Sequence, residues 1–313
     1  MKRIISRISN GIGNQMFLYA ASFSLSKKLN RKLYLDIYTG LNSDINKNKK
    51  KKFKHFTPKF ELKYFDISAS ILDKKDTFDS FFGYIKRKFL IFLDKFLTKK
   101  NFLIEHKNKK KITHYKAFPT NNNYKDTIFL EGYFESEKYF YKYRNELIKE
   151  FTLKNKVICN ENYLKKIQKT ESVSMTIRAD RFNERKEDDS NKNKIKKSLD
   201  YEKQQIKFIL RSMKYFNKKL KKPFFFIFSD NPAKFSHLFK KNKQVIFINK
   251  HKKNKVIEDY FLISQCKHFA VGPTSFHFWP AWLSEYKKKI CIRPKDLNLS
   301  NNINYWPKKW VKI

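Results

Sequence analysis

Short apolar runs of strand length alternate with segments of helix length along most of this 313-residue chain. The first half predicts a strand at 3–8, a helix at 14–29, a strand at 32–36, a strand at 128–131 and a helix at 136–151. The second half predicts, in chain order, strand 172–177, helix 200–219, strand 224–228, short helix 232–239, strand 244–248, helix 256–266, strand 269–271, helix 275–285 and strand 289–292. Such alternation is typical of parallel sheets covered by helices on both faces. The chain is therefore predicted to be α/β.

The alternation stops at about residues 151–163 and then begins again. This break predicts an N-terminal Rossmann-like domain at 1–152, a second domain at 153–297 and a C-terminal tail at 298–313. In sheets of this kind, ligands bind at the carboxyl ends of the strands. We therefore expect the parallel sheets of the two domains to face a central cleft that holds the ligand.

A glycine turn joins the first strand to the first helix. Gly11 and Gly13 are two of only six glycines in the chain, so they are expected to meet a need of the backbone rather than to be filler. Asn14 and Gln15 follow directly, where the helix begins. The N–H groups of a helix N-terminus can hold a polar or anionic ligand, although one short glycine motif is weak evidence for a phosphate site.

The formal net charge of +42 raises nucleic acid, an anionic membrane or an acidic ligand as partners. Only ten of the 71 basic residues are arginine, whereas surfaces that read bases or clamp phosphates favour the guanidinium fork. A compositionally biased genome would also produce this abundance of Lys, Asn, Ile and Phe. Attraction to anionic lipid headgroups remains an expectation, and nucleic-acid binding is the remote alternative.

Three cysteines without paired spacing or a histidine cluster argue against a disulfide scaffold and a zinc site. No apolar run has the length of a signal peptide or a membrane span, which favours a cytoplasmic protein. The segment 81–97 could form a helix with five large apolar residues on one face. Packing of that face on the domain core is expected over membrane docking.

Three segments of the second half end predicted strands with polar residues. Arg178 and Asp180 follow the strand at 172–177, where an arginine can bind a phosphate or make an ordinary ion pair. Ser229 and Asp230 follow the strand at 224–228, where helix capping is the simplest role. The third segment, 274–276, begins a helix.

In that third segment, the hydroxyls and N–H groups of Thr274 and Ser275 could bind a diphosphate. Phe276 begins an aromatic run that belongs to the core by default. His277 is expected to be structural rather than a catalytic base.

Several segments, in order, resemble the bacterial α-1,2-fucosyltransferases of glycosyltransferase family 11. Residues 11–17, Gly-Ile-Gly-Asn-Gln-Met-Phe, are similar to the family's opening signature, with Asn10 in place of its first glycine. The other resembling segments are Glu-Gly-Tyr-Phe-Glu-Ser at 131–136, Phe-Ser-Asp-Asn at 228–231, Glu-Asp-Tyr-Phe-Leu-Ile-Ser at 258–264 and Pro-Thr-Ser-Phe-His-Phe-Trp at 273–279. Their order along the chain makes a chance match improbable.

The resemblance implies a GT-B-like fold and an inverting transfer of L-fucose from GDP-fucose, without a required metal, to the 2-hydroxyl of a galactose-type acceptor. The acceptor would belong to surface polysaccharide or lipopolysaccharide assembly and could be linked to lipid, which would place the enzyme at the inner membrane face. The first domain would take the acceptor and the second the nucleotide sugar.

The resemblance and the chemistry of the transfer together predict the roles of individual residues, because positive groups stabilise a leaving diphosphate and an inverting transfer needs a base. Catalytic roles fall to Arg178 and Asp180, and Arg178 also contacts the donor. Further donor contacts fall to Ser229, Asp230, Thr274, Ser275 and Phe276, and acceptor or cleft roles fall to Gly11, Gly13, Asn14 and Gln15.

One motif departs from the family pattern. The family's His-x-Arg-Arg-Gly-Asp-Tyr stands here as Thr-Ile-Arg-Ala-Asp-Arg-Phe at 176–182, which keeps Arg178 and, with a one-residue gap, Asp180. A donor carrying another GDP-linked sugar is therefore the main alternative. An inverting transfer also needs a base, for which Asp36, Asp180, Glu184 and Glu187 are candidates.

Overall fold

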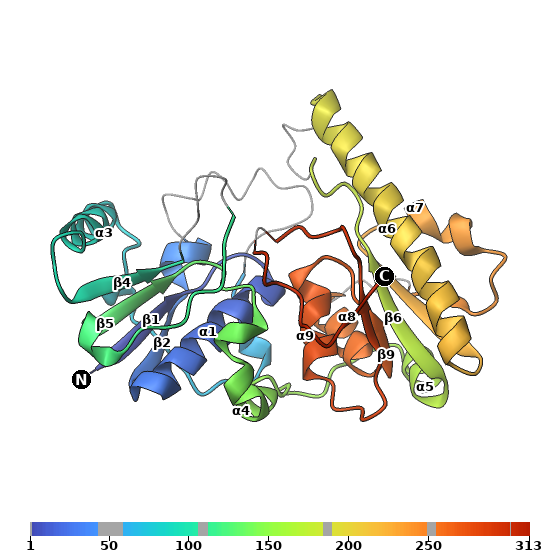
Figure 1. The fold of residues 1–313 in the computed structure, drawn as a ribbon, viewed down its shortest axis with the longest axis horizontal. Coiled ribbons are helices and arrows are strands. Elements are labelled where there is room, and N and C mark those ends of the chain that lie inside the picture. Colours follow the sequence, from blue (N-terminus) through green and yellow to red (C-terminus); the bar gives the residue numbers. More distant parts are fainter. Residues whose placement is uncertain (1, 43–58, 106–111, 184–189, 249–254, 301) are drawn as a thin grey trace. The chain divides into compact units, whose positions relative to one another are not determined.

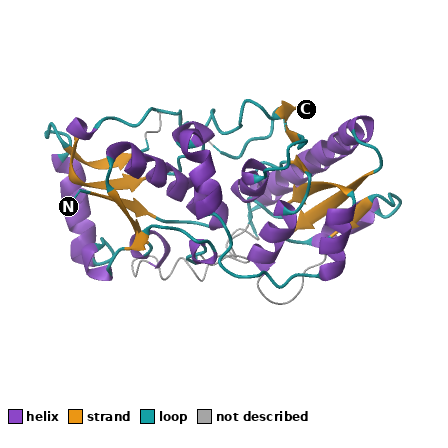
Figure 2. Cartoon of the chain, turned by 90° about the horizontal axis from the view of Figure 1, so that it is seen from below, coloured by secondary structure: helices purple, strands orange, loops and turns teal. Residues whose placement is uncertain are grey.

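The computed structural model describes residues 2–42, 59–105, 112–183, 190–248, 255–300 and 302–313. Over these residues the chain forms two units, each built around its own fully parallel sheet (Figures 1 and 2). The predicted α/β class with two Rossmann-like domains is confirmed. The first unit contains the described residues up to Lys154 together with Ser300–Pro307. The second unit contains Asn155–Leu299 and Lys308–Ile313. Nothing in the sequence indicated that the tail divides between the two units.

The first unit has a five-stranded sheet in the order β3-β2-β1-β5-β4. Its elements are β1 (Arg3–Arg7), α1 (Ile12–Leu29), β2 (Lys32–Asp36), β3 (Ser70–Ile71), α3 (Phe81–Leu93), β4 (Lys100–Ile104), β5 (Tyr124–Glu131) and α4 (Arg144–Glu150). The helix α1 is buried on nearly every side, which its apolar and small residues permit. It ends at Asn30, whose left-handed conformation (φ 49°) lets its N–H reach back to the last turn.

The second unit has a six-stranded sheet in the order β11-β10-β9-β6-β7-β8. Its strands are β6 (Glu171–Ile177), β7 (Pro223–Ser229), β8 (Val245–Phe247), β9 (His268–Ala270), β10 (Cys291–Arg293) and β11 (Val311–Lys312). Its helices are α5 (Glu161–Lys169), α6 (Lys192–Lys219), α7 (Pro232–Phe235), α8 (Lys255–Ser264) and α9 (Ser275–Leu283).

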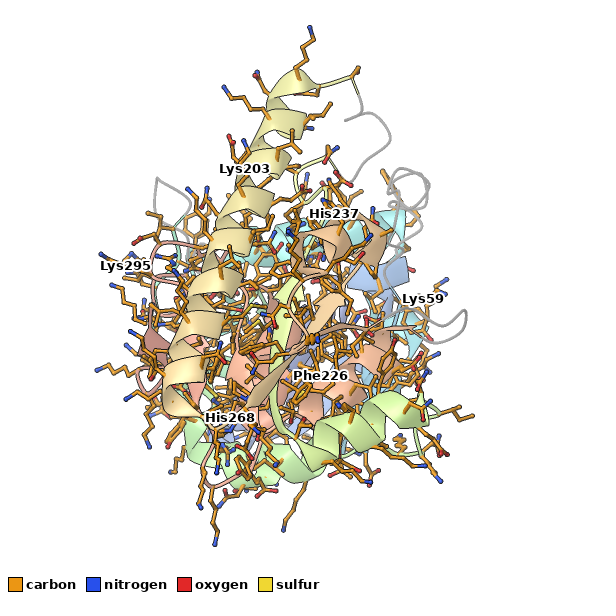
Figure 3. The ribbon with its side chains drawn as sticks, turned by 90° about the vertical axis from the view of Figure 1, so that its right-hand side faces the viewer. Lys59, Lys203, Phe226, His237, His268 and Lys295 are labelled. Atoms are coloured by element: carbon orange, nitrogen blue, oxygen red, sulfur yellow. The ribbon has the colours of Figure 1, made fainter. Side chains whose placement is uncertain are left out.

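The long helix α6 lies across one face of the second sheet (Figure 3). Its Phe208, Ile209 and Met213 pack against Val173 and Met175 of β6 in one buried cluster. Full burial of each large apolar side chain contributes about 1.5–3 kcal/mol, so this cluster holds the helix to the sheet. The carboxyl ends of the neighbouring strands β9, β6 and β7 consequently lie at an edge of the sheet that the packing of α6 stabilises.

Two of the predicted helices differ from the structure by the most residues. The segment 136–151 begins with two short 3-10 turns, and only Arg144–Glu150 is α-helical. The break lies at Phe140 (φ −139°, ψ 0°), whose ring is fully buried and contacts Phe17. The helix predicted to begin at residue 200 begins instead at Lys192, where the Asn191 side chain accepts a hydrogen bond from the Lys194 N–H.

The expected packing of segment 81–97 on the core is wrong. Within α3 only Gly83 is buried, and the large apolar side chains of its predicted face are exposed. No helix among the described residues is long and apolar enough to cross a membrane.

Candidate functional site

Arg178 follows the last residue of β6, and its backbone is held from both sides by one side chain. The amide of Gln205 on α6 accepts from the Arg178 N–H at 3.0 Å and donates to the Arg178 carbonyl at 2.9 Å. Gln205 is 2% exposed, so its own position is fixed by packing. The guanidinium group of Arg178 therefore extends from a backbone whose direction is set by α6.

Asp230 directly follows β7, and its carboxylate contacts the loop that carries Arg178. Its Oδ1 accepts from the Ala179 N–H at 2.9 Å, and its Oδ2 lies 3.8 Å from Arg178 Nε, which is an ion-pair distance rather than a hydrogen bond. The side chains of Arg178 and Asp230 both keep more than a third of their surface exposed. Parallel β6 and β7 thus bring two of the predicted donor residues together at one edge.

The cap of α7 differs from the expectation for Ser229 and Asp230. Asn231 is the N-cap, and its side chain accepts from the Lys234 N–H at 3.3 Å. The Ser229 hydroxyl accepts from the Asn231 N–H at 3.1 Å, so it shapes the turn. Asp230 is consequently released from capping, and its carboxylate is available to the β6 loop.

Asp180 takes part in a second ion-pair group on this edge. Lys234 Nζ lies 2.8 Å from Glu202 Oε1 and 3.3 Å from Asp180 Oδ1, and the Asp180 N–H donates to Glu202 Oε1 at 2.9 Å. Burial alone would lower the pKa of Lys234, but the two carboxylates outweigh it and raise that pKa. Lys234 therefore remains a cation, and Asp180 (φ 51°) is held in a left-handed turn beside it.

His277 links β6 to the loop that precedes α9. Its ring nitrogens lie 2.9 Å from Ser174 Oγ and 3.1 Å from Thr176 Oγ1, and the Gly272 N–H donates to Nδ1 at 3.2 Å. A Cβ on Gly272 would lie 2.6 Å from Thr176 Oγ1, so only glycine allows this approach. The structural role expected for His277 fits these contacts.

The same contacts position the start of α9. Thr274 is its N-cap and accepts from the His277 N–H at 3.4 Å. Thr274, Ser275 and Phe276 are all partly exposed, whereas the aromatic residues that follow are buried. The free hydrogen-bonding capacity of a helix N-terminus therefore lies at the end of β9, next to β6 in the sheet.

In the first unit, the turn after β1 is left-handed at Asn10 (φ 63°), not at a glycine. Gly11 is the N-cap of α1 with φ −84°, a conformation open to any residue. The left-handed conformation that would favour glycine is therefore found one position earlier, at Asn10. Gly13 is buried within α1, and Asn14 is partly exposed at its first turn.

Gln15 fastens this turn to a neighbouring segment. It is fully buried, and its amide donates to the carbonyls of Asn10 and Lys59 at 2.7 Å each and accepts from the Glu61 N–H at 2.9 Å. Its polar atoms are thus used by the backbone, and a sugar contact would fall to its neighbours. This correction follows from burial, which a short motif does not reveal.

Glu61 was missed by the sequence analysis. Burial raises the pKa of its carboxyl group, while a hydrogen bond from the Ile12 backbone and the charges of Lys59 and Lys63 oppose that rise. A carboxylate of the chain itself therefore meets the N-terminus of α1. The anion site suggested by the glycine turn already has an occupant.

The structure describes two of the four candidate bases, Asp36 and Asp180, and each has its own partners. Asp36 is buried and its Oδ1 accepts from the N–H groups of Tyr38 and Thr39, so it shapes the turn after β2. Asp180 has Lys234 as its partner. Glu184 and Glu187 lie outside the described residues.

Gln205, Glu202 and Lys234 are further site residues that the sequence analysis missed. A signal was present for two of them. Glu202 and Gln205 lie three apart on α6, among the apolar positions that face the sheet, and both are buried. Buried polar residues on an apolar helix face usually have a specific partner.

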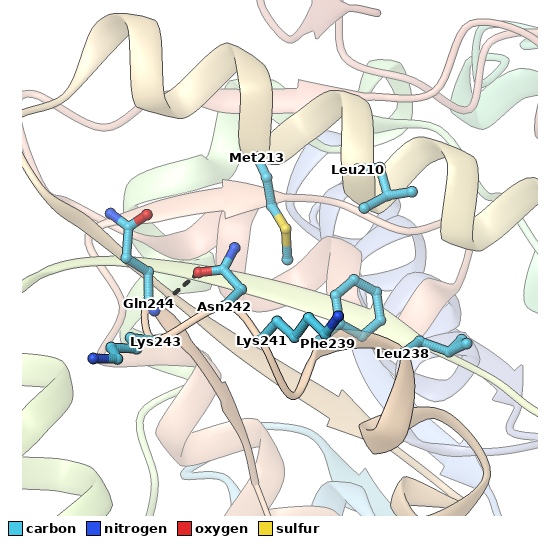
Figure 4. A pocket seen from close by; sticks show the side chains of 8 residues that line it. All are labelled: Leu210, Met213, Leu238, Phe239, Lys241, Asn242, Lys243 and Gln244. Atoms are coloured by element: carbon cyan, nitrogen blue, oxygen red, sulfur yellow. Dashed lines mark hydrogen bonds between the residues drawn. The ribbon is translucent and has the colours of Figure 1, made fainter.

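A hollow lined by eight residues lies away from this edge (Figure 4). It is lined by Leu210 and Met213 of α6, Leu238, Phe239 and residues 241–244, which precede β8. It therefore lies at the amino end of β8, opposite the edge that carries Arg178 and Asp230. None of the predicted site residues lines it. Within the described residues there is also no group of three or more His, Cys, Asp or Glu side chains placed to hold a metal ion.

The buried ring of His277 predicts a loss of stability in acid. Burial lowers the pKa of His277 from 6.5 to about 3. Between these values the unfolded chain binds a proton that the native chain does not, so stability falls as the pH falls, by up to about 1.4 kcal/mol per pH unit. His277→Gln should remove this part of the slope in urea unfolding curves measured from pH 7 to pH 5.

His237→Gln is the matched control, because His237 is exposed on the second unit. That variant should keep the wild-type slope. An equal slope in wild type and His277→Gln would contradict a buried, neutral ring.

The left-handed turn predicts the effect of two substitutions at Asn10. Asn10→Gly should be tolerated, because glycine adopts φ 63° without strain. Asn10→Val should lower the free energy of unfolding by about 1–3 kcal/mol, because a β-branched residue is strained there. Thermal unfolding of both variants measures the difference, and equal melting temperatures would show that the turn is not left-handed.

Comparison with known proteins places the chain in a family. A sequence model described as "Glycosyl transferase family 11" matches residues 85–313. An α-1,2-colitosyltransferase of Escherichia coli is 27% identical, and the match covers 100% of this chain and 99% of that protein. The O-antigen biosynthesis glycosyltransferase WbnK of Escherichia coli is 25% identical, with 95% of each chain covered.

Solved structures of lower similarity include two fucosyltransferases. NodZ from Bradyrhizobium is 12% identical, with a TM-score of 0.45 over 89% of this chain and 91% of that one. FUT1 of Arabidopsis thaliana is also 12% identical, with a TM-score of 0.48 over 95% of this chain and 71% of that one. The family match alone covers well over half of the sequence. The chain is a glycosyltransferase and belongs to glycosyltransferase family 11.

Proposed function

We propose that this glycosyltransferase moves L-fucose from GDP-fucose to the 2-hydroxyl of a galactose-type acceptor, with inversion and without a required metal. The second unit would hold the nucleotide sugar and the first the acceptor. The observation that carries the proposal is the grouping of Arg178, Asp230 and the start of α9 at the carboxyl edge of one parallel sheet. Ligands of open α/β sheets bind at this edge.

The charges of this edge suit a diphosphate leaving group. Negative charge on the diphosphate grows as the bond to the sugar breaks, and fixed positive groups stabilise that charge. Arg178 would supply a guanidinium group, and Thr274 and Ser275 would supply N–H and hydroxyl groups of a helix N-terminus. Phe276 would close this side of the site.

Asp230 and Ser229 would act nearer the nucleoside. The Asp230 carboxylate fixes Arg178 and is still partly exposed, so it can also accept from N–H or hydroxyl groups of a nucleoside. Asp180 would keep the loop in shape through Lys234 and Glu202. In the first unit, Gly11 and Asn14, which are partly exposed, would face the acceptor, on a turn that Gln15 fastens, and the buried Gly13 would shape the helix behind them.

The names of the two relatives support a particular linkage and a particular class of acceptor. The colitosyltransferase is an α-1,2 enzyme, which supports transfer to a 2-hydroxyl, and WbnK acts in O-antigen biosynthesis, which supports an acceptor of lipopolysaccharide assembly. The first name also favours a second candidate donor, GDP-colitose. Colitose is L-fucose without its 3-hydroxyl, so the two donors differ in one hydrogen-bonding group.

The test compares donors with one protein preparation. GDP-fucose, GDP-colitose and GDP-mannose are incubated separately, and GDP release and GDP affinity are measured. A site that hydrogen-bonds the 3-hydroxyl should favour GDP-fucose over GDP-colitose strongly. Preference for GDP-colitose would select the second candidate, and absence of GDP binding would contradict the proposal.

Arg178→Ala should lower kcat/KM for the preferred donor by about 10²–10³-fold, because it removes positive charge from the leaving group. Arg211→Ala is the matched control, since Arg211 is exposed on α6 and outside the predicted site. Equal activity of the two variants would exclude Arg178 from catalysis.

A further inference from the structure

The helix α3 exposes a continuous apolar face in an otherwise strongly charged protein. The exposed fractions along this face are 69% for Phe81, 81% for Phe82, 48% for Ile85, 58% for Phe89, 52% for Phe92 and 73% for Phe96. Single exposed apolar residues are ordinary on protein surfaces, but a contiguous patch marks a contact site. Helical periodicity places Phe81, Ile85, Phe89, Phe92 and Phe96 within one stripe of the helix and the turn that follows it.

The opposite side of α3 fastens it to the first unit. A Cβ on Gly83 would lie 2.9 Å from the Phe78 backbone, so the helix approaches closely there. Arg87 binds both carboxylate oxygens of Glu131, with Nε 2.7 Å from Oε1. Asp94 accepts from the N–H groups of Asn101 and Phe102 at the start of β4. These contacts fix which side faces outward, and Figure 1 shows α3 beside β4.

Lysines border the apolar stripe, and no free carboxylate lies beside it on the helix. Lys88 and Lys95 lie at one margin and Lys86 at the other. Lys88 Nζ lies 4.5 Å from the Tyr84 ring centre and Lys95 Nζ 5.8 Å from that of Phe92, so the cations stay close to the aromatic rings. Asp94, the only acidic residue of segment 81–97, is turned toward β4.

We propose that α3 docks this enzyme on the surface of an anionic lipid bilayer. A helix with aromatic residues on one face and lysines at its margins suits the boundary between acyl chains and headgroups, where the rings enter and the cations meet lipid phosphates. The net charge of +42 adds attraction to the same surface. Arg87 is committed to Glu131, which raises the pKa of Arg87 and keeps it charged, so lipid contacts fall to the lysines.

The docking proposal does not depend on the identity of the donor. It concerns a helix that carries none of the predicted donor or acceptor residues. GDP binding and lipid binding can therefore be measured separately on the same variants.

The test is co-sedimentation of the full chain with vesicles. Vesicles of phosphatidylcholine with about one third phosphatidylglycerol should bind the protein, and vesicles of phosphatidylcholine alone should bind it at least tenfold more weakly. Phe81→Ser/Phe89→Ser/Phe92→Ser should lower binding to the anionic vesicles at least tenfold. Ile158→Ser/Leu199→Ser/Leu210→Ser, which alters three exposed apolar residues of the second unit, should bind like wild type.

A charge series separates docking by α3 from general attraction. Lys86→Gln/Lys88→Gln/Lys95→Gln should weaken anionic vesicle binding by about fivefold per lysine. Lys203→Gln/Lys207→Gln/Lys214→Gln, on exposed positions of α6, should weaken it much less. All variants should keep wild-type melting temperatures, because the altered side chains are exposed.

Three results would overturn the proposal. Equal binding of wild type and the triple Phe variant would mean that charge alone attaches the protein. Equal effects of the two lysine sets would mean that attachment is not centred on α3. Failure to bind anionic vesicles, together with a wild-type dimer that the Phe variant converts to a monomer, would assign the face to a second copy of the chain.

Discussion

The second unit depends on a neutral histidine in the first turn of α9, which is buried against β6 and the loop that follows β9. His277 ties the side chains of Ser174 and Thr176 on β6 to the backbone of Gly272 after β9. Because the ring is fully buried, it can remain only in its uncharged form without a large loss of stability. The start of α9 is therefore fixed next to the end of β6, which is where the proposed leaving-group contacts lie.

A second set of buried polar residues fixes the loop that carries Arg178. Gln205 and Glu202 extend from α6 and bind backbone groups of Arg178 and Asp180. Neither residue is among the predicted donor contacts, yet both hold the backbone from which the Arg178 guanidinium group extends. The motif at 176–182 keeps only one of the two arginines of the family pattern, Arg178. Its backbone is nevertheless held in one orientation by hydrogen bonds to Gln205 of α6.

The sequence predicted the layout of the fold well and the partners of individual side chains poorly. Alternating strands and helices are a local signal, so the two parallel sheets were foreseen. Short strands such as β3 and β11 were not, since two residues carry no periodicity. The roles of Gln15, Asp36 and Asn231 depend on contacts with distant or buried backbone groups, and no spacing rule reveals them.

The helix α3 shows the limit of periodicity in another way. The stripe of five apolar residues was recognised, but the pattern alone does not say whether a face turns inward or outward. The structure answers this through Gly83, Arg87 and Asp94, whose contacts occupy the other side. The proposed docking on a bilayer uses this outward-facing side of the helix.

We propose that the carboxyl edge of the second sheet holds the diphosphate of a nucleotide sugar. A crystal structure of the chain with GDP would show where the diphosphate binds. We expect the diphosphate within about 3 Å of the Arg178 guanidinium group and of the N–H or hydroxyl groups at Thr274 and Ser275, with the nucleoside near Asp230. A diphosphate bound at the N-terminus of α1, with Glu61 displaced, would contradict a donor site in the second unit.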